Sequence, residues 1–353
     1  MTDQVRELID KLEAQHSLAE EEYALLAEGG DSDAASYAAA KADRVRREIY
    51  GNEVFIRGLI EVSSYCKNDC LYCGLRRSNT QADRYRLTEE EILECADEGY
   101  KLGFRTFVLQ GGEDPHFSPL LVCGIVSSLK SAHPDSAVTL SLGEQTKDIY
   151  KSYREAGADR YLLRHETADA DHYGKMHPSD MSFDNRMRCL KDLRELGFQV
   201  GCGFMVGSPY QTSQTIAKDL KFIEEFKPEM CGIGPFVPHR HTPFGMFEQG
   251  SLEQTLFLLS VIRLINPKVL LPATTALGTI DPRGRELGIM AGANVVMPNL
   301  SPVSVRKKYE LYNGKICTGE EAAECIRCLD ARMQSIGYKI AVGRGDYPDN
   351  KTI

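Results

Sequence analysis

Three cysteines in one short segment are the residues of this chain whose types and spacing most clearly indicate chemistry. Cys66, Cys70 and Cys73 stand at C-x3-C-x2-C spacing within the segment Ser64–Gly74, after the apolar, β-branched run Val54–Val62. Cysteine thiolates are the usual protein ligands of iron–sulfur clusters. Three thiolates from one loop can hold three irons of a 4Fe–4S cluster, and the fourth iron then keeps an open position for chemistry.

Structural zinc is the alternative interpretation of the same cysteines. A structural zinc site normally takes four tetrahedral ligands, with a second pair of ligands later in the chain. The next cysteine after Cys73 is Cys95, inside a predicted helix, and the next histidine is His116. Because no fourth ligand follows closely, the spacing favours an iron–sulfur cluster over zinc.

Polar residues also follow several of the predicted strands. One strand ends in Gln110, Gly111, Gly112 and Glu113. The glycines let a backbone approach a ligand closely, and the carboxylate beside them can accept hydrogen bonds from an ammonium group. Taken alone, this element also fits an ordinary turn. Further polar residues on or after strands are Thr139, Ser141, Arg164, Glu166, Thr274 and Thr275.

Arg164 ends a predicted buried strand and therefore needs an anionic partner, because an unpaired buried charge is strongly disfavoured. A structural ion-pair network is one explanation of the run Arg164–Thr167. Two residues along an extended chain share a face, so Glu166 is one candidate partner. A substrate carboxylate is the other, with Thr274 and Thr275 donating hydrogen bonds alongside.

A second group of cysteines lies near the C-terminus. Cys317, Cys325 and Cys328 form a C-x7-C-x2-C set beyond the last predicted strand. Three cysteines in twelve residues favour a zinc site or a second iron–sulfur cluster, either 2Fe–2S or 4Fe–4S, over free thiols. The fourth position would need water or another group.

Eight predicted strands position these residues, and helical patterns separate them. The strands are Val54–Val62, Thr106–Gln110, Ala137–Leu142, Arg160–Leu163, Gln199–Met205, Met230–Ile233, Val269–Pro272 and Asn294–Met297. Strands that alternate with helices indicate parallel βαβ units. The simplest α/β architecture is a closed (βα)8 TIM-type barrel, whose working face lies at the C-terminal strand ends. A doubly wound open sheet is the alternative architecture. We rank it below the barrel because the G-x-G-x-x-G motif that often follows the first strand of such a sheet is missing.

Three regions are expected along the chain. The sequence predicts a helical extension at residues 1–52 and the barrel at residues 53–300. Residues 301–353 are predicted to form a segment that packs on the barrel and carries the second cysteine set. Of 353 residues, 42% are hydrophobic and 26% are charged, which is typical of a soluble globular protein. No apolar run reaches the roughly 20 residues of a membrane span.

The overall charge and the cysteine content bear on which partners the protein binds and in which compartment it works. A net charge of −9 argues against a general nucleic-acid binder. Eleven cysteines, found in motifs and helices, together with an N-terminus lacking an apolar signal region, indicate a reducing cytoplasm.

The cysteine loop, with Tyr72 directly before the third cysteine, resembles the signature of the radical S-adenosylmethionine (SAM) superfamily. Over about Val54–Cys328 the chain resembles one family in it, HydE, the radical SAM maturases of [FeFe]-hydrogenase. The matching segments include LQGGEDP, VTLSLGE, DRYLLRHETAD, MVGSPYQT, PATTALGT and YNGKIC. Biotin synthase and methylornithine synthase are weaker matches.

The resemblance implies roles for individual residues. Cys66, Cys70 and Cys73 would hold the 4Fe–4S cluster, and Cys317, Cys325 and Cys328 an accessory cluster that many members lack. SAM would contact Tyr72, Gln110, Gly111, Gly112, Glu113, Ser141, Glu166 and Arg186. Because SAM would then occupy Glu166, we expect a substrate carboxylate, rather than Glu166, to be the partner of Arg164. The inner cavity would be lined by Thr139, Arg164, Met230, Thr274, Thr275, Tyr309 and Tyr312. Gly111 is a departure, because many members have serine there.

The family's chemistry implies reductive cleavage of SAM to a 5′-deoxyadenosyl radical, in maturation of the hydrogenase's di-iron subcluster. The implied partners are a small iron–cysteine complex or amino-acid-like substrate, other hydrogenase maturases, and a low-potential electron donor such as ferredoxin or flavodoxin. The competing functions are an amino-acid mutase of the methylornithine synthase type and a non-catalytic iron–sulfur scaffold.

Overall fold

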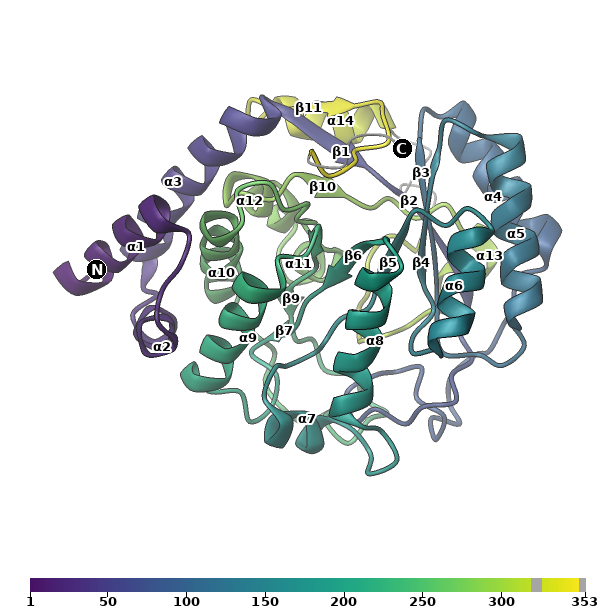
Figure 1. Ribbon diagram of the computed structural model, residues 1–353, viewed down its shortest axis with the longest axis horizontal. Helices are drawn as coiled ribbons and strands as arrows, with labels where there is room; N and C mark the ends of the chain where they lie inside the picture. The colour runs from purple at the N-terminus through teal and green to yellow at the C-terminus, as the bar shows by residue number, and fades with distance from the viewer. Residues whose placement is uncertain (319–325, 349–353) are drawn as a thin grey trace.

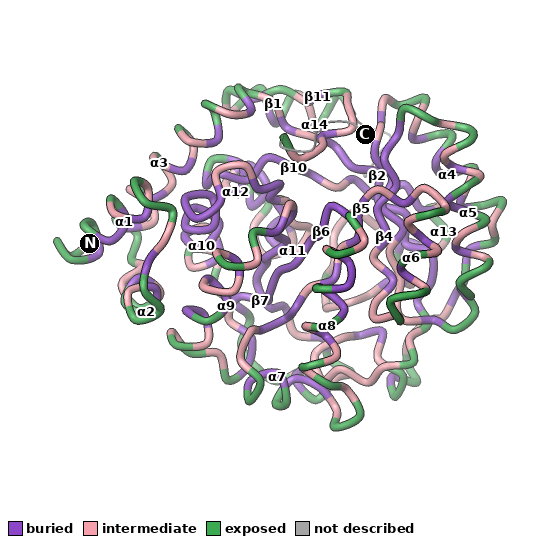
Figure 2. Tube along the Cα trace, in the orientation of Figure 1, coloured by how far each residue is buried: buried purple, intermediate pink, exposed green. Residues whose placement is uncertain are grey.

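A six-stranded parallel sheet forms the centre of the computed structural model, which describes residues 1–318 and 326–348 (Figure 1). The strand order is β2-β3-β4-β5-β6-β8. The bounds are Gly58–Ser63 (β2), Thr106–Gly111 (β3), Ala137–Ser141 (β4), Arg160–Leu162 (β5), Gln199–Cys202 (β6) and Met230–Cys231 (β8). Most of their residues are buried (Figure 2), as expected for a parallel sheet covered by helices.

Helices return the chain between these strands and lie outside the sheet (Figure 1). They are α4 (Glu89–Lys101), α5 (Pro119–Ala132), α6 (Lys147–Glu155), α7 (Ala170–Met176), α8 (Phe183–Glu195), α9 (Ser213–Phe226) and α10 (Leu252–Ile265). A serine or threonine begins six of them, and its hydroxyl accepts a hydrogen bond from the backbone N–H three residues on. These N-caps are Thr88, Ser118, Thr146, Ser182, Thr212 and Ser251.

Two smaller sheets continue the ring of strands. One has the order β10-β1-β11, with β1 at Glu53–Ile56, β10 at Val295–Val296 and β11 at Lys339–Ala341. The other pairs β7 (Met205–Val206) with β9 (Gly234–Pro235). Single parallel bridges link the sheets, at Met230–Leu270, Pro272–Val295 and Leu59–Asn299. The (βα)8 arrangement is therefore present, but its hydrogen-bonded ladder does not close into one continuous barrel.

Several strand predictions need correction. The predicted strand Val54–Val62 is split at Arg57 into β1 and β2, and the predicted strand Gln199–Met205 is divided between β6 and β7. In both cases the two parts belong to different sheets. The segment Val269–Pro272 makes only isolated bridges. Strand β11 was not predicted, and it pairs in parallel with β1 from the far end of the chain.

The first three helices pack on one side of the barrel. They are α1 (Asp3–Gln15), α2 (Glu20–Glu28) and α3 (Ser32–Tyr50). Helix α2 packs against α9, and α3 packs against α10. Gly51 ends α3 with a φ of 58°, a conformation that glycine adopts without steric cost.

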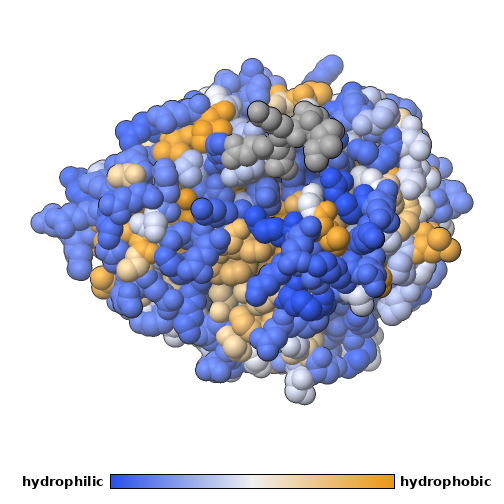
Figure 3. All heavy atoms as spheres, in the orientation of Figure 1, coloured by the Kyte–Doolittle hydropathy of each residue, from blue (hydrophilic) through white to orange (hydrophobic). Residues whose placement is uncertain are grey.

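The remaining helices follow the last strands and the C-terminal segment. They are α11 (Thr275–Ile280), α12 (Gly284–Met290), α13 (Val303–Arg306) and α14 (Ile326–Gln334). The face seen in Figure 3 is mainly hydrophilic, with separate smaller apolar areas. None of the described helices combines the length and apolar character that crossing a bilayer requires.

Candidate functional site

The cysteine loop leaves the C-terminal end of β2 and is held by neighbouring loops. The N–H of Lys67 donates to the carbonyl of Glu113 at 2.9 Å, and the N–H of Leu71 donates to the carbonyl of Met176 at 3.0 Å. These contacts fix the loop on both sides of Cys70. The three cysteine side chains are free thiols in this structure.

The three thiols share one electrostatic environment. Burial is the main cause that raises the pKa of each thiol, and it raises the pKa of Cys73 to about 12. The pKa of Cys70 is raised further by the negative charges of Cys73 and Cys66. Within the described residues, no three histidine, cysteine, aspartate or glutamate side chains gather around a single metal ion. Cysteine thiolates are the usual ligands of 4Fe–4S clusters, so three thiols in one loop are a donor set that fits such a cluster.

Gly112 gives the cysteine loop room to lie against the end of β3. A Cβ added at Gly112 would lie 2.2 Å from the carbonyl oxygen of Tyr65 and 2.7 Å from the Cβ of Cys66. A Cβ added at Gly111 would lie 3.2 Å from the side chain of Val62, and 3.6 Å from both the side chain of Leu142 and the carbonyl oxygen of Ser63. Gly112 is thus required by packing, whereas Gly111 leaves nearly enough space for the serine that the resemblance implies at this position.

Glu113 already forms an ion pair with an ammonium group in this structure. Its Oε2 lies 3.1 Å from the Nζ of Lys67, and its Oε1 accepts from the N–H of Glu144 at 3.0 Å. The side chain lies across Gly143, where any Cβ would overlap it. The carboxylate is therefore fixed beside the cysteine loop, as the resemblance to the superfamily predicts for a group that receives the amino group of SAM.

Asp114 joins the cysteine loop to β3, and we did not predict it. Its Oδ2 accepts from Ser63 at 2.6 Å, and Arg86 contacts both carboxylate oxygens, at 2.7 and 3.0 Å. Burial opposes its ionisation, but the hydrogen bonds from Arg86 and Ser63 outweigh burial and lower its pKa. A carboxylate directly after two glycines and a glutamate was the only sequence signal available.

Tyr72, Glu166 and Arg186 lie within electrostatic reach of the cysteine loop. Burial raises the pKa of Tyr72, and the next causes are the charges of Glu166 and Cys70. Arg186, from α8, pairs with Glu144 and donates to the carbonyl of Arg164 at 2.6 Å. Ser141 ends β4. The structure thus brings Tyr72, Glu166 and Arg186 together beside the cysteines.

Arg164 does contact Glu166, so the expectation that Glu166 would not be its partner is wrong. The Arg164 Nη2 and Glu166 Oε2 atoms are 3.2 Å apart, because both side chains turn toward the same space at the end of β5. The contact is an ion pair without a well-directed hydrogen bond, since Arg164 Nε and Nη2 and Glu166 Oε2 have no hydrogen-bond partner in the structure. Arg164 therefore retains donors for a ligand.

Other orphaned polar atoms come from the predicted cavity residues. The hydroxyls of Thr139 and Thr274 are buried without a hydrogen-bond partner. Thr274 is the N-cap of α11, yet its side chain makes no capping hydrogen bond, and Thr275 is the first residue of that helix. Buried polar groups are normally hydrogen-bonded. Unused hydroxyls on two sides of the barrel are the expected state of a ligand-binding interior.

Met230 is buried at the start of β8 and receives a contact that we did not predict. The Nη1 of Arg57 lies 2.9 Å from its sulfur. Arg57 is 5% exposed, and its Nε and Nη2 have no hydrogen-bond partner in the structure. Burial holds the pKa of Arg57 well below its usual range. A lone arginine inside a predicted strand was the available signal.

The predicted aromatic residues lie near the same interior. The amide of Gln110 donates to the hydroxyl of Tyr309 at 3.4 Å. Lys315 lies 5.0 Å from the centre of the Tyr309 ring and pairs with the fully buried Glu61 at 2.5 Å. Burial raises the pKa of Tyr309 and of Tyr312. Both hydroxyls therefore stay protonated at neutral pH.

The second cysteine set is not assembled as three free thiols in the described part of the chain. Cys317 is free, and its sulfur accepts from Arg285 Nη2 at 2.9 Å. Cys328 is disulfide-bonded, so it is not a free thiolate here. Cys325 lies outside the described residues. The predicted accessory site thus remains a prediction.

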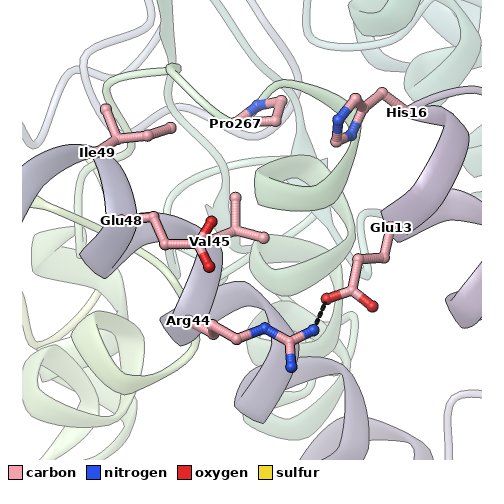
Figure 4. A pocket seen from close by; sticks show the side chains of 7 residues that line it. All are labelled: Glu13, His16, Arg44, Val45, Glu48, Ile49 and Pro267. Atoms are coloured by element: carbon pink, nitrogen blue, oxygen red, sulfur yellow. Dashed lines mark hydrogen bonds and ion pairs between the residues drawn. The ribbon is translucent and has the colours of Figure 1, made fainter.

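A surface pocket elsewhere on the molecule is unrelated to these residues (Figure 4). It lies between α1, α3 and the segment after α10, and Arg44 and Glu13 form an ion pair on its wall. Its lining residues are Glu13, His16, Arg44, Val45, Glu48, Ile49 and Pro267. None of them belongs to the predicted site, and we assign the pocket no function.

Comparison with known proteins agrees with the fold and the cysteine loop, which together define a radical SAM enzyme. Residues 60–223 match the model of the Radical SAM superfamily. The chain is 47% identical, over 84% of its length and 85% of the other protein, to the [FeFe] hydrogenase maturase subunit HydE of Thermotoga maritima. The chain belongs to the HydE family.

More distant relatives share the architecture. The chain is 32% identical, over 86% of its length and 85% of the relative, to 3-methylornithine synthase of Methanosarcina barkeri. The crystal structure of methylornithine synthase (PylB) superposes with a TM-score of 0.82 at 29% identity, covering 95% of this chain and 97% of that one. HydG, a maturase of the [FeFe]-hydrogenase, superposes with a TM-score of 0.81 over 100% of this chain and 79% of that one. At 22% identity it shows the fold alone.

Proposed function

We propose that this protein reductively cleaves SAM and acts in assembly of the active-site cluster of [FeFe]-hydrogenase. The observation that carries the proposal is the 47% identity to a HydE over most of both chains. The cysteine loop, the fixed Glu113 carboxylate and the orphaned donors of the barrel interior support it. Membership of a maturase family also points to other hydrogenase maturases as partners.

Different residues around the cysteine loop would bind the cluster and SAM. Cys66, Cys70 and Cys73 would hold a 4Fe–4S cluster, and Glu113 would accept from the amino group of SAM in place of Lys67. Together with SAM, such a cluster supplies one-electron cleavage of the sulfonium bond and a 5′-deoxyadenosyl radical. The protein supplies orientation and a site that excludes water.

Tyr72, Ser141, Glu166 and Arg186, with the backbone of residues 110–112, would complete the SAM site. Arg186 is held by Glu144 and by the carbonyl of Arg164, so its guanidinium is positioned before any ligand arrives. Such preorganisation reduces the entropy lost on binding.

For the substrate, we propose a small molecule that carries a carboxylate, such as an iron–cysteine complex or an amino acid. Arg164 retains unused donors, and the hydroxyls of Thr139 and Thr274 lack partners. An arginine fork can bind a carboxylate through two hydrogen bonds. Thr275, Met230, Tyr309 and Tyr312 would complete the walls.

A test needs two measurements, because cleavage of SAM and maturation are separate claims. Purified, anaerobically reconstituted protein should form 5′-deoxyadenosine when SAM and a low-potential reductant are added. The gene should also restore hydrogenase activity to cells that lack their own HydE. Cleavage without restoration would favour the methylornithine-type reaction that the relatives suggest, and no cleavage would favour a scaffold.

We further propose that Cys317, Cys325 and Cys328 hold an accessory iron–sulfur cluster. Their density in the sequence supports this, and a position beyond the barrel strands makes a role in SAM cleavage unnecessary. A triple alanine variant should lose iron but retain cleavage, and loss of cleavage in a folded variant would contradict the proposal. The free thiols of the described cysteines other than Cys328 fit a reducing cytoplasm, with ferredoxin or flavodoxin as electron donor.

A further inference from the structure

The segment Arg164–Ala168, after β5, carries Glu166 in a left-handed backbone conformation. Its φ is 66°. For a residue with a side chain this conformation is sterically unfavourable, because the Cβ comes too close to the following carbonyl oxygen. The surrounding structure must therefore hold it in place. One such contact is the N–H of Glu166, which donates to the carbonyl of Gly203 at 3.0 Å.

A fully buried pair of residues holds the rest of this segment. The Nε2 of His165 lies 3.3 Å from Oδ1 of Asp219, on α9, and both side chains are 0% exposed. The same Oδ1 accepts from the N–H of Ala168 at 2.5 Å. Asp219 therefore contacts the segment on both sides of Glu166, through a side chain before it and a backbone amide after it.

The hydrogen-bond donors determine which nitrogen of His165 carries the proton. The N–H of Gly203 donates to Nδ1 at 3.1 Å, and a backbone N–H can only donate. Nδ1 must therefore be unprotonated, so Nε2 carries the hydrogen and faces the Asp219 carboxylate. The angle of this contact falls short of a well-directed hydrogen bond. His165 thus links β6 to α9 through one ring.

The pair does not face the site itself. The His165 ring packs against Phe222 of α9 and Phe204, with ring centres 4.8 and 6.0 Å apart. Full burial among aromatic rings on the helix side keeps both residues from touching SAM or substrate. Their effect on the site must pass through the backbone of residues 164–168.

We propose that His165 and Asp219 are positioning residues that hold Glu166 in its left-handed conformation and so aim its carboxylate at SAM. The inference rests on the proposed function, in which Glu166 contacts SAM. Arg164 and Glu166 flank His165, so the same pair also sets the spacing between the SAM-binding carboxylate and the substrate-binding guanidinium.

The experiment measures SAM binding without turnover, in reconstituted protein to which no reductant is added. Asp219→Ala removes both contacts, and the SAM dissociation constant should rise at least tenfold. Asp219→Asn retains a carbonyl oxygen for the Ala168 N–H and for Nε2–H, so it should restore binding to within about threefold of wild type. It also keeps the test valid if the alanine variant does not fold.

Asp159→Ala is the matched control. Asp159 likewise accepts from a backbone N–H, that of Val138 at 2.8 Å, and pairs with a cation, Arg344 at 2.9 Å, but at the opposite end of the barrel. It should lower thermal stability without weakening SAM binding. Equal dissociation constants for Asp219→Ala and Asp159→Ala would overturn the inference.

A second measurement does not involve SAM. Hydrogen exchange of the Glu166 and Ala168 amides in the apo-protein should accelerate at least tenfold in Asp219→Ala and remain near wild type in Asp159→Ala. Unchanged exchange would also overturn the inference. Wild-type protein that fails to cleave SAM after reduction would instead refute the proposed function, so the two failures are distinguishable.

Discussion

Strand β5 has an arginine at each end, and the two arginines have different partners: Arg160 is its first residue, and Arg164 lies just past its last. At the N-terminal ends of the strands, Arg160 is fully buried and donates to Asp346 at 2.6 Å and to the carbonyl of Arg344 at 2.7 Å. Arg344 in turn pairs with Asp159 at 2.9 Å. At the C-terminal end, Arg164 keeps two nitrogens without hydrogen bonds, although its Nη2 lies 3.2 Å from Oε2 of Glu166.

The difference separates stability from function. A satisfied buried ion network contributes to a single rigid structure, whereas an unsatisfied donor costs free energy unless a ligand completes it. The same residue type, arginine, is therefore structural at one end and available for binding at the other. The predictions below test this division, from the largest expected effect to the smallest.

Loss of a cluster ligand should have the largest effect at the functional end. Cys70→Ala removes one of three thiolates, and we expect formation of 5′-deoxyadenosine to fall below detection while the fold is kept. Iron content and circular dichroism would be measured on the same sample. The control is Cys123→Ala, because Cys123 lies on α5, away from the loop. Normal turnover in Cys70→Ala would remove the basis of the assignment.

At the structural end, Arg160→Leu should mainly reduce stability. It leaves Asp346 without its buried partner, and breaking a buried pair typically costs about 3–5 kcal/mol. Chemical denaturation should show this loss in the free energy of unfolding. Cleavage of SAM per folded molecule should stay near wild type, and a large specific loss of turnover would contradict the division between the two ends.

Arg164→Lys should have the opposite effect to Arg160→Leu, with function reduced and stability kept. It keeps the charge and the ion pair with Glu166 but loses the planar fork. We expect normal SAM cleavage, near-normal stability, and maturation weakened by the loss of one charge-assisted hydrogen bond, about 1.5–3 kcal/mol of substrate binding. Hydrogenase activity in complemented cells is the measurement. Wild-type activity would make Arg164 a structural partner of Glu166.

The smallest effect concerns pH and Asp346. Burial opposes its ionisation, but hydrogen bonds from Arg344 and the charge of Arg160 outweigh burial and lower its pKa. Because the folded pKa lies below the unfolded value of about 3.9, the carboxylate stabilises the fold above pH 4. This stability is lost as the pH falls from about 4 through the folded pKa.

Asp346→Asn should therefore lower the free energy of unfolding at pH 7 and flatten its decline below pH 4. Urea denaturation at pH 7, 4 and 3 would measure both effects. The Asp330→Asn variant is the control, since Asp330 accepts hydrogen bonds from the N–H of Ile340 and the amide of Gln334, at 3.0 and 2.6 Å, rather than from arginines. An unchanged acid slope in Asp346→Asn would mean that other carboxylates control acid unfolding.

Much of this architecture could be predicted from local patterns. Apolar runs between capped helices gave the parallel strands, and the C-x3-C-x2-C spacing gave the loop with its three neighbouring thiols. The break at Arg57 could not be predicted, because it depends on which strands pair on each side. Strand β11 was missed for the same reason.

Side-chain partners were harder to predict than elements. Extended geometry placed Arg164 and Glu166 on one face, and we set Glu166 aside as a partner only because the family resemblance assigns it to SAM. In the structure the two side chains form an ion pair, and Glu166 adopts a left-handed conformation that depends on distant residues. The roles of Asp114 and Asp219 likewise arise from contacts between segments 51 residues apart in each case, with Ser63 and with Ala168. Only the folded structure brings these partners together.

The pairing of β11 with β1 has a consequence for how the chain folds during synthesis. Thr106 donates to the carbonyl of Arg344, 238 residues further along, and Arg160 depends on Asp346. Contacts between such distant residues close large loops and form late. The ribosome delivers residues 339–346 after all eight barrel segments. The nascent barrel must therefore wait without the carboxylate partner of Arg160, and in this interval it would be most exposed to chaperones and to misfolding.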